Sequence, residues 1–272
     1  MRILIQGEKG SFSHAAVQAM APGASVLPCA LSAEVFQRLV SGEASAAVIP
    51  IENSLAGSVA EHFDLLLAHA GRVFIRREFP LRIRHCLIAP VGTRLRDVRR
   101  VFSHPVALAQ CRNFFQSHPA VVALPFYDTA GGVKHVIEVG AKDAAAIAGR
   151  TAAEVYQGVI LKSGLEDNKK NFTRFLVINR QQAIPRGANK VSLAFALRNV
   201  PGSLAGALEI FAAAGIDLSK IESRPVPGHP WQYVFYADLL TAPGRNLNSC
   251  LARLSSRADF VKILGIYRAV HE

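Results

Sequence analysis

The sequence predicts an α/β protein in two parts, a larger domain with a mainly parallel sheet and a smaller domain with the order βαββαβ. In the first two thirds of the chain, short apolar runs alternate with amphipathic, alanine-rich segments. This alternation is typical of strands and helices built around a parallel sheet. A polar segment then interrupts the pattern, after which strand and helix signals begin again. The length of 272 residues suits two domains.

The strands of the first domain are predicted from its short apolar runs. Helices are predicted at His14–Met20 and at Ser58–Ala68, where apolar residues recur on one face. In parallel sheets ligands bind beyond the carboxyl ends of the strands, so polar residues that directly follow a strand are candidate site residues. The predicted strands are Arg2–Gln6, Ala46–Ile51, Val101–Ser103, Ala145–Ala148 and Phe175–Ile178.

The second domain follows the polar segment Arg180–Asn189, which contains Pro185 and Gly187 and is the best linker candidate. We therefore predict one domain over residues 1–180 and another over residues 190–272. The second domain has the ferredoxin-like order of strands and helices. Its elements are a strand at Val191–Leu197, a helix from Pro201-Gly202 to Ala214, strands at Ile216–Pro225 and Trp231–Leu240, a helix at Asn246–Arg257 and a strand at Phe260–Val270.

Composition excludes several classes of protein. Half of the residues are hydrophobic and 19% are charged, which is the balance of a folded globular chain and not of a disordered one. The longest apolar runs are much shorter than the roughly 20 residues of a membrane span. Arg2–Gln6 already has the pattern of a buried strand, and we therefore expect no targeting segment. We expect a cytoplasmic protein without a membrane partner.

The basic excess is spread along the chain. Lys and Arg number 31 against 20 Asp and Glu, which gives a net charge of +11. The densest basic stretches, Arg72–Arg84 and Arg94–Arg100, lack the interleaved aromatic residues of a single-strand nucleic-acid platform. A solvated basic face is the favoured interpretation, and attraction of a small anionic substrate is the next. Nucleic-acid binding is not expected.

The four cysteines, Cys29, Cys86, Cys111 and Cys250, show neither metal-ligand nor dithiol spacing. Their apolar neighbours indicate buried thiols. The sequence therefore predicts no metal site.

Two polar clusters follow predicted strands in the first half of the chain. Asn53 and Ser54 come after Ala46–Ile51 and can supply amide and hydroxyl donors, although an ordinary turn explains them equally well. Ser58 is interpreted as a helix N-cap. Ser103 comes directly after Val101–Phe102, at the end of another strand, and Gln110 lies seven residues further on, where the two could meet if Ser103 begins a helix.

Two further clusters lie later in the first domain. Asp128–Gly132 is predicted to be a glycine-rich turn whose backbone donors, together with Thr129, could surround a carboxylate. Asn171–Phe175 places the Thr173 hydroxyl, a potential proton donor, next to the guanidinium of Arg174, a potential carboxylate clamp. A Ser-His-Asp triad is not supported, because the chain has no Gly-x-Ser-x-Gly elbow.

Together these clusters resemble the prephenate dehydratase family. The resemblance rests on Gly10-Ser11-Phe12-Ser13, Pro50–Ser54 with Gly57-Ser58-Val59, Ser103-His104-Pro105 with Gln110, Asp128–Gly131 and Asn171–Phe175. The C-terminal part resembles the phenylalanine-binding ACT regulatory domain of that family in two motifs. These are Gly202-Ser203-Leu204, after Pro201, and Glu222-Ser223-Arg224-Pro225.

The resemblance implies a fold and an activity. The catalytic domain would have two lobes, like type II periplasmic binding proteins, with the chain leaving and re-entering the first lobe. The enzyme would convert prephenate to phenylpyruvate, water and carbon dioxide in phenylalanine biosynthesis, without cofactor or metal. Thr173 would assist the departing hydroxyl and Arg174 would hold a carboxylate. Asn53, Ser54, Ser103, Gln110 and Thr129 would complete the site.

The resemblance also implies regulation. L-Phenylalanine would bind at Gly202, Ser203, Leu204 and Glu222–Pro225 and inhibit the enzyme, which would be a homodimer or homotetramer. Two positions depart from the family pattern: Val106 stands where glutamine often follows Ser-His-Pro, and Ser203 replaces alanine. We expect a monofunctional enzyme, because Arg2–Gln6 is already the first strand of the domain.

Two alternatives remain open at this stage. An arogenate dehydratase would run the same reaction on the transaminated substrate. A non-catalytic amino-acid sensor could use the same two-lobed fold with an ACT domain, although a sensor has no need of a proton donor beside its clamp.

Overall fold

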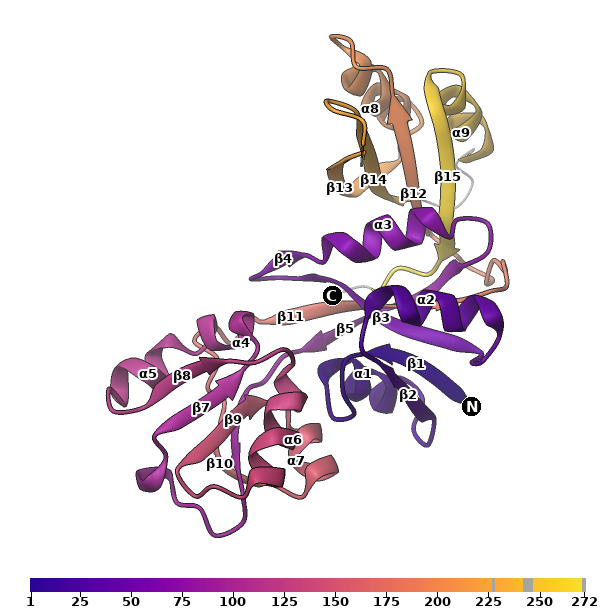
Figure 1. Cartoon of the computed structure of the whole chain (residues 1–272). Helices are drawn as coiled ribbons and strands as arrows, with labels where there is room; N and C mark the ends of the chain where they lie inside the picture. The colour runs from indigo at the N-terminus through magenta and orange to yellow at the C-terminus, as the bar shows by residue number, and fades with distance from the viewer. Residues whose placement is uncertain (227, 242–246, 271–272) are drawn as a thin grey trace. The chain divides into compact units, whose positions relative to one another are not determined.

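The computed structural model describes residues 1–226, 228–241 and 247–270 (Figure 1). The chain forms two compact units, one made of residues 1–59 and 79–175 and the other of residues 60–78 and 176–272. The second unit therefore includes a segment from the first third of the sequence, in addition to the C-terminal region that the linker predicts.

The first unit begins with a lobe built on parallel strands. β1 (Arg2–Gln6) lies between β2 (Ser25–Cys29) and β3 (Ala46–Asn53), and β11 (Phe172–Asn179) follows β3 in the sheet. The two pairs that β1 makes are parallel. Two helices accompany these strands, α1 (Phe12–Met20) and α2 (Ser32–Ser41). The predicted strand Arg2–Gln6 is confirmed, and the predicted helix His14–Met20 begins two residues earlier.

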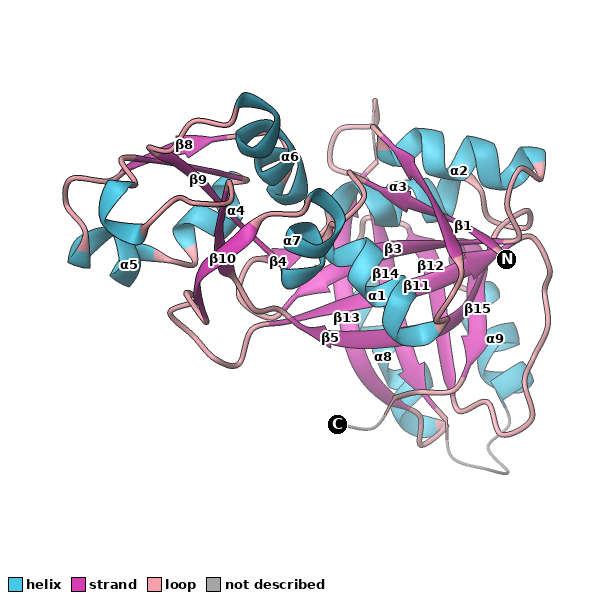
Figure 2. Ribbon diagram, turned by 90° about the horizontal axis from the view of Figure 1, so that it is seen from below, coloured by secondary structure: helices cyan, strands magenta, loops and turns pink. Residues whose placement is uncertain are grey.

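The second lobe is a five-stranded sheet with helices on both faces (Figure 2). Its strand order is β10 (Val159–Ser163), β6 (Cys86–Ala89), β9 (Ala144–Ala148), β7 (Arg100–Ser103) and β8 (Val122–Pro125). α6 (Thr129–Val139) and α7 (Arg150–Tyr156) pack on one face of this sheet. α4 (Pro105–Ala109) and α5 (Arg112–Ser117) pack on the other, and a short 3₁₀ helix, η1, covers Leu95–Asp97. All five residues of β9 are buried, as expected of a central strand covered on both faces.

Two crossover segments connect the lobes, residues 83–85 and residues 164–171. Hydrogen bonds join them to each other: the Ile83 N–H donates to the Asn171 carbonyl at 2.8 Å, and the Leu165 N–H donates to the His85 carbonyl at 3.0 Å. The chain leaves the first lobe and returns to it, which confirms the two-lobed architecture that the family resemblance implies.

The second unit contains the predicted βαββαβ order. Its elements are β12 (Lys190–Leu197), α8 (Ser203–Ala213), β13 (Asp217–Pro225), β14 (Tyr233–Leu240), α9 (Leu247–Ser255) and β15 (Ala258–Tyr267). The sheet order is β13-β14-β12-β15 with every pair antiparallel, which is a ferredoxin-like arrangement. Residues 180–189 form the connecting loop that was predicted as a linker. Residue 246, at the predicted start of the last helix, lies outside the described residues.

The segment 60–78 joins the second unit through charged and aromatic contacts. Phe63 on α3 (Ala60–Ala68) packs against Tyr236 with ring centroids 5.1 Å apart. Glu78 on β5 (Phe74–Arg82) accepts a 2.8 Å hydrogen bond from Lys190, and both side chains are buried. Because a buried charge is costly unless it is paired, this contact specifies where the segment packs.

The start of α3 corrects one prediction from the sequence. Gly57–Ser58 is a two-residue strand, β4, that pairs back on β3, and the helix begins only at Ala60. Ser58 is therefore not the helix N-cap. The two β4 residues pair with Glu52 and Asn53, so this hairpin constrains the chain at one of the candidate site residues.

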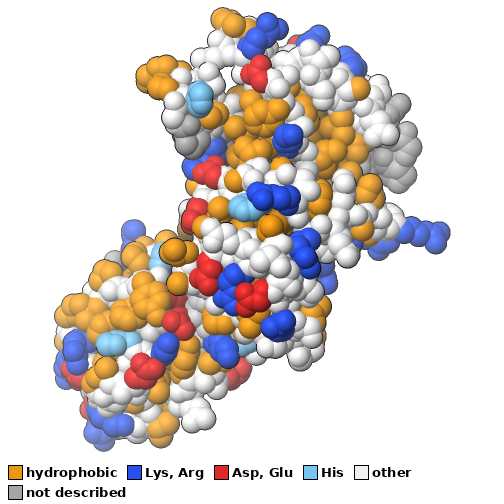
Figure 3. Space-filling model, turned by 45° about the vertical axis from the view of Figure 1, so that its right-hand side comes forward, with side chains coloured by type: hydrophobic (Ala, Val, Ile, Leu, Met, Phe, Trp, Pro, Cys, Tyr) orange, Lys and Arg blue, Asp and Glu red, His pale blue; other side chains and the backbone are white. Residues whose placement is uncertain are grey.

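Among the described residues, no helix is both long enough and apolar enough to cross a membrane. Lys and Arg are dispersed among other side chains on the face that Figure 3 shows, as the even spread of basic residues along the sequence predicts. The four cysteines are free and buried, which confirms the interpretation of their apolar surroundings.

Candidate active site

A cavity of about 510 Å³ lies in the first unit and is lined by polar and apolar residues of both lobes. This volume is typical of a small-molecule site. The first lobe contributes the ends of β1 and β2, the start of α1, and β11. The second lobe contributes His104, Tyr127, Asp128 and Thr129. The lining includes two of the predicted site residues, Thr129 and Thr173.

The side-chain amide of Asn53 has one possible orientation. Its Oδ1 accepts hydrogen bonds from the backbone N–H groups of Leu55 and Ala56, at 3.0 and 2.9 Å. Its Nδ2 donates to the backbone carbonyl of Phe172 at 3.1 Å. Since a backbone N–H can only donate and a carbonyl can only accept, the oxygen and nitrogen of this amide cannot be exchanged.

Thr173 receives a hydrogen bond from this amide. Asn53 Nδ2 donates to Thr173 Oγ1 at 2.9 Å and to the side-chain oxygen of Asn171 at 2.8 Å, so its two hydrogens serve three acceptors and one hydrogen is shared. In the described part of the chain, the Thr173 hydroxyl makes no other hydrogen bond. Its own hydrogen is thus free to point into the cavity that Thr173 lines. The site can therefore offer a hydroxyl donor to a group bound in the cavity.

Gln110 completes this network. Asn171 uses its oxygen for Asn53, so its nitrogen donates to Gln110 Oε1 at 2.9 Å. Gln110 Nε2 then donates to Asn53 Oδ1 at 3.3 Å. The structure brings Asn53, Gln110 and Thr173 together, as predicted for one site, and adds Asn171, which is fully buried. The Asn-Phe-Thr-Arg-Phe motif contained this residue, but the sequence offered no sign of its partner.

Arg174 requires a correction. Neighbouring residues of a strand project to opposite faces, and Thr173 and Phe175 both line the cavity. Arg174 instead forms an ion pair with Glu52, with its Nε 2.6 Å from Glu52 Oε1, and only 15% of its side chain is exposed. The expectation that a guanidinium clamp and a proton donor would share one cavity because they are adjacent in sequence does not hold in this structure.

The hydroxyls of Ser103 and Ser54 form hydrogen bonds with backbone groups. Ser103 ends β7 and is fully buried, and its hydroxyl donates to the Ile147 carbonyl at 2.6 Å. His104, not Ser103, caps the short helix that follows, so Ser103 and Gln110 are not brought together. The Ser54 hydroxyl donates to the Lys170 carbonyl and accepts from the Phe172 N–H, each at 3.0 Å. It thereby ties β3 to the start of β11.

The segment Asp128–Gly132 begins a helix and is not a glycine-rich turn. Asp128 is the N-cap of α6, and its carboxylate accepts the Gly131 N–H at 2.8 Å. That donor is therefore not available to a ligand. Gly131 allows close packing, because a Cβ there would lie 2.7 Å from the Tyr127 ring. Thr129 is the first residue of the helix and lines the cavity.

Acidic groups that the sequence analysis did not select contribute to the cavity. Glu8 accepts a 2.8 Å hydrogen bond from Tyr127 and lies 3.5 Å from the Lys134 ammonium. Burial, together with the bond to Glu8, raises the pKa of Tyr127 to about 12. Burial also raises the pKa of Asp128, although the backbone N–H groups of Gly131 and Ala130 act in the opposite direction. None of the described lining residues is a lysine or an arginine.

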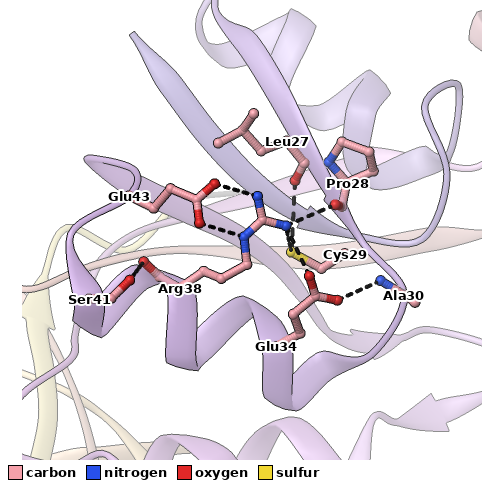
Figure 4. A network of polar contacts seen from close by, with 8 residues as sticks. All are labelled: Leu27, Pro28, Cys29, Ala30, Glu34, Arg38, Ser41 and Glu43. Carbon is pink, nitrogen blue, oxygen red and sulfur yellow. Dashed lines mark hydrogen bonds and ion pairs between the residues drawn. The ribbon is translucent and has the colours of Figure 1, made fainter.

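Hydrogen bonds of Arg38 on α2 stabilise one wall of the cavity (Figure 4). Its guanidinium bonds to Glu43 at 2.7 and 2.5 Å, to Glu34 at 3.0 Å and to the Pro28 carbonyl at 3.3 Å. Glu34 in turn accepts the Ala30 N–H at 3.1 Å. Pro28 and Ala30 line the cavity, so this network fixes the end of β2 against α2.

Within the described ranges, no group of three or more His, Cys, Asp or Glu side chains is placed to hold a metal ion. The polar side chains that line the cavity carry hydroxyls, carboxylates, one amide, one thiol and one imidazole. These can bind polar ligands and donate or accept protons.

The fold and site define a two-lobed α/β protein with a hydroxyl donor in its interlobe cavity and a ferredoxin-like unit in the same chain. The family model described as prephenate dehydratase matches residues 3–183. The chain therefore belongs to the prephenate dehydratase family.

Curated relatives match nearly the whole chain. A protein of Arabidopsis thaliana named arogenate dehydratase/prephenate dehydratase 2, chloroplastic, is 38% identical over 98% of this chain and 72% of its own length. The bifunctional chorismate mutase/prephenate dehydratase of Aquifex aeolicus is 33% identical over 98% of this chain and 73% of its own.

Solved structures agree with the fold over both units. Prephenate dehydratase from Arthrobacter aurescens, in complex with L-Phe, has a TM-score of 0.90 and 32% identity, over 99% of this chain and 90% of that one. A protein described as a novel type of quorum quenching acylase, GqqA, has a TM-score of 0.91 and 34% identity, over 99% and 98% of the two chains.

The raised pKa of Asp128 predicts a pH-dependent loss of stability. A carboxyl whose pKa is higher in the folded state stabilises most when protonated, and this contribution is lost as pH rises through the folded pKa. Asp128→Asn keeps a good N-cap but cannot ionise. The free energy of unfolding of the native protein, relative to this variant, should fall as pH rises from about 4, the usual Asp pKa. Denaturant unfolding of both proteins at several pH values measures this free energy. A free energy of unfolding of the native protein that rises with pH, relative to Asp128→Asn, would contradict a raised pKa of Asp128.

Proposed function

We propose that this protein converts prephenate to phenylpyruvate, water and carbon dioxide. The observation that carries the proposal is the Thr173 hydroxyl in the interlobe cavity, which accepts from Asn53 and keeps its own hydrogen for a ligand. Membership of the prephenate dehydratase family and the names of its relatives support the same reaction. The cytoplasmic location and the absence of any cofactor remain predictions.

The reaction needs one proton and breaks two bonds of the substrate. The ring carboxylate leaves as carbon dioxide, and the electron pair of the broken carbon–carbon bond enters the ring. The ring hydroxyl leaves with its bonding electrons and takes up the proton, which forms water. Because the ring becomes aromatic in this step, the main tasks of the protein are to orient the substrate and to stabilise the departing oxygen.

Thr173 is assigned to the departing oxygen. Its hydrogen bond to that oxygen strengthens as negative charge develops there, so it stabilises the transition state more than the bound substrate. An alcohol is a weak acid, and its effect therefore depends on being aimed in advance. The fixed Asn53 amide orients the hydroxyl, because its N–H donates to Thr173 Oγ1 and the hydroxyl hydrogen must then point elsewhere.

The substrate carboxylates need donors other than Arg174. Hydroxyls of Ser11, Ser13 and Thr129 line the cavity and can donate to carboxylate oxygens. Ser11 and Ser13 lie at the start of α1 and Thr129 at the start of α6, so these groups lie at the positive ends of two helix dipoles. Arogenate carries an ammonium group where prephenate has a carbonyl, and the carboxylates of Glu8 and Asp128 suit such a group. Arogenate is therefore the second candidate substrate.

The acylase described for a structural neighbour is not proposed for this chain. Acyl transfer by a serine needs a base within hydrogen-bond reach of its hydroxyl. Ser11, Ser13 and His104 line the cavity, yet in the described residues neither serine hydroxyl bonds to a histidine ring.

The direct test is turnover of prephenate, followed as phenylpyruvate, in parallel with arogenate, followed as phenylalanine. Thr173→Val removes the hydroxyl at nearly constant shape and should lower kcat by ~10²–10⁴-fold with little change in KM. Thr173→Ser keeps the hydroxyl and should retain most of the activity. A folded Thr173→Val variant with near-normal kcat would exclude this role for Thr173, and no turnover of either substrate would exclude the function.

We also propose that the second unit is a regulatory ACT domain that binds L-phenylalanine. β12 and β13 run in the same direction, and the register β13-β14-β12 places Arg224 level with Ala196. The two predicted motifs, after β12 and at the end of β13, therefore lie at the same end of the sheet. Gly202 has φ = 84° and caps α8, which supplies free N–H groups for a carboxylate. The neighbour crystallised with L-Phe supports this ligand.

Several of the predicted regulatory residues have partners within the second unit. Leu204 packs against the core of the unit, and Arg224 pairs with Asp64 of α3 at 2.7 Å. Ser203 is half-buried at the start of α8, and Ser223 and Pro225 belong to β13. Glu222 lies 3.3 Å from Lys220 and is the proposed acceptor for the ligand ammonium.

A homodimer or homotetramer is proposed on the same grounds. β13 forms one end of the sheet of this unit, with nine residues from Asp217 to Pro225. Such an edge can pair with a strand of another chain, and a second copy would protect it. In this arrangement the end of β13 that carries Glu222–Pro225 lies close to the contact between copies.

Phenylalanine binding can be measured by calorimetry. Replacing a charge-assisted hydrogen bond at the ammonium, as in Glu222→Gln, should weaken binding about tenfold or more. Glu209→Gln, an exposed glutamate on α8 of the same unit, is the matched control and should bind normally. Prephenate should weaken phenylalanine binding by the same factor by which phenylalanine weakens prephenate binding. Absence of any heat at millimolar phenylalanine, with an active enzyme, would remove the regulatory proposal.

A further inference from the structure

His85 is a buried histidine that the reaction described above does not use. It lies in the first crossover segment and is 1% exposed. Its backbone is held on both sides: its N–H donates to the buried Glu166 carboxylate at 2.9 Å, and its carbonyl accepts the Leu165 N–H at 3.0 Å. The edge of Phe12, a cavity-lining residue, meets its ring with centroids 5.5 Å apart. The imidazole is therefore fixed next to the candidate active site.

The ring contacts the Thr173 network through Gln110. His85 Nε2 lies 2.9 Å from Gln110 Oε1. The backbone partners of Asn53 fix the direction of that amide, which fixes Asn171, whose nitrogen donates to the same Gln110 oxygen. Gln110 Oε1 is consequently an acceptor, so His85 Nε2 must carry a hydrogen and donate it.

The other ring nitrogen supports the same protonation state. Within the described structure, Nδ1 of His85 has no hydrogen-bond partner. A hydrogen placed there would be a buried donor without an acceptor, which is more costly than leaving the nitrogen bare. Burial also lowers the pKa of His85, which favours the neutral ring. The tautomer with hydrogen on Nε2 alone satisfies all the contacts.

We propose that His85 is a positioning residue for Thr173, and that it acts as the first donor in a one-way chain of hydrogen bonds. The order is His85 Nε2 to Gln110 Oε1, Gln110 Nε2 to Asn53 Oδ1, Asn53 Nδ2 to Thr173 Oγ1, and Thr173 to the bound ligand. The last step rests on the proposed function, whereas the first three rest on the described contacts alone.

This chain has a physical consequence for the hydroxyl. When every donor in a series points the same way, each bond polarises the next, and the final hydrogen becomes a stronger donor. His85 also holds Gln110 in the orientation that presents Nε2 to Asn53. Without His85, Gln110 Oε1 loses one of its two donors, and the Gln110 amide is less firmly held. Thr173 would then donate less effectively, although substrate would still bind.

Two substitutions separate this role from simple packing. His85→Leu fills most of the space but cannot donate, and its kcat should fall about 10–100-fold, as is usual for residues that orient an active group, with KM nearly unchanged. His85→Gln offers a side-chain N–H near the position of Nε2 and should recover part of that loss. Melting temperatures of both variants identify any loss that comes from unfolding.

The tautomer can be measured without any turnover. In ¹⁵N-labelled protein, the two ring nitrogens of His85, assigned by comparison with His85→Gln, should show hydrogen on Nε2 and a bare Nδ1 at neutral pH. A hydrogen on Nδ1 would overturn the proposal whatever the substrate is. Wild-type kcat in folded His85→Leu would also overturn it. If neither prephenate nor arogenate is turned over while the Nε2 tautomer is observed, the proposed reaction fails and the donor chain stands.

Discussion

The site depends on the orientation of one side-chain amide, that of Asn53. Two backbone N–H groups bind its oxygen and a backbone carbonyl binds its nitrogen, so its polarity is set by the fold. The orientation of this amide determines how the amides of Asn171 and Gln110 point and from which side the Thr173 oxygen accepts a hydrogen bond. A network anchored in this way can direct a weak alcohol donor with little reorganisation, which is the main requirement when the chemistry itself is driven by aromatisation.

The two crossovers between the lobes make this arrangement possible. Asn171 and His85 lie one on each crossover, and backbone hydrogen bonds join the segments at Ile83–Asn171 and Leu165–His85. The network thus joins groups from β3, from the C-cap of α4, from β11 and from both connections, which are far apart in the sequence. The deep burial of His85 and Asn171 costs little because their polar atoms, apart from His85 Nδ1, find partners.

Much of the fold could be predicted from the sequence, because periodicity reports local structure. Arg2–Gln6 and the βαββαβ order are confirmed, whereas the division at Arg180–Asn189 stays a prediction, since the second unit already begins at Leu176. The placement of residues 60–78 in the second unit could not be predicted, since it depends on distant partners such as Lys190 for Glu78 and Tyr236 for Phe63. Sequence patterns carry no information on pairings of this kind.

The residues of the site could likewise be predicted only in part from the sequence. Asn53 was predicted from a polar cluster after a strand, Gln110 from its spacing to Ser103 and Thr173 from the cluster that enters the strand Phe175–Ile178, and the three side chains meet in the structure. Adjacency in sequence does not place Arg174 beside Thr173, because neighbours on a strand face opposite ways. The helical spacing expected between Ser103 and Gln110 fails for another reason: His104 caps the helix, and the Ser103 hydroxyl donates to the Ile147 carbonyl. His85 gave no signal, since a lone histidine before an apolar strand is usual in a core. Its role depends on Gln110, 25 positions away.

Neutron diffraction on crystals of the fully deuterated protein tests most directly whether the Thr173 hydroxyl accepts from Asn53 and donates into the cavity. We predict a deuterium of Asn53 Nδ2 between that atom and Thr173 Oγ1, with the Thr173 deuterium directed into the cavity. A Thr173 deuterium that points toward the side chain of Asn53 or Asn171 would contradict it, because the hydroxyl could not then donate to a departing oxygen.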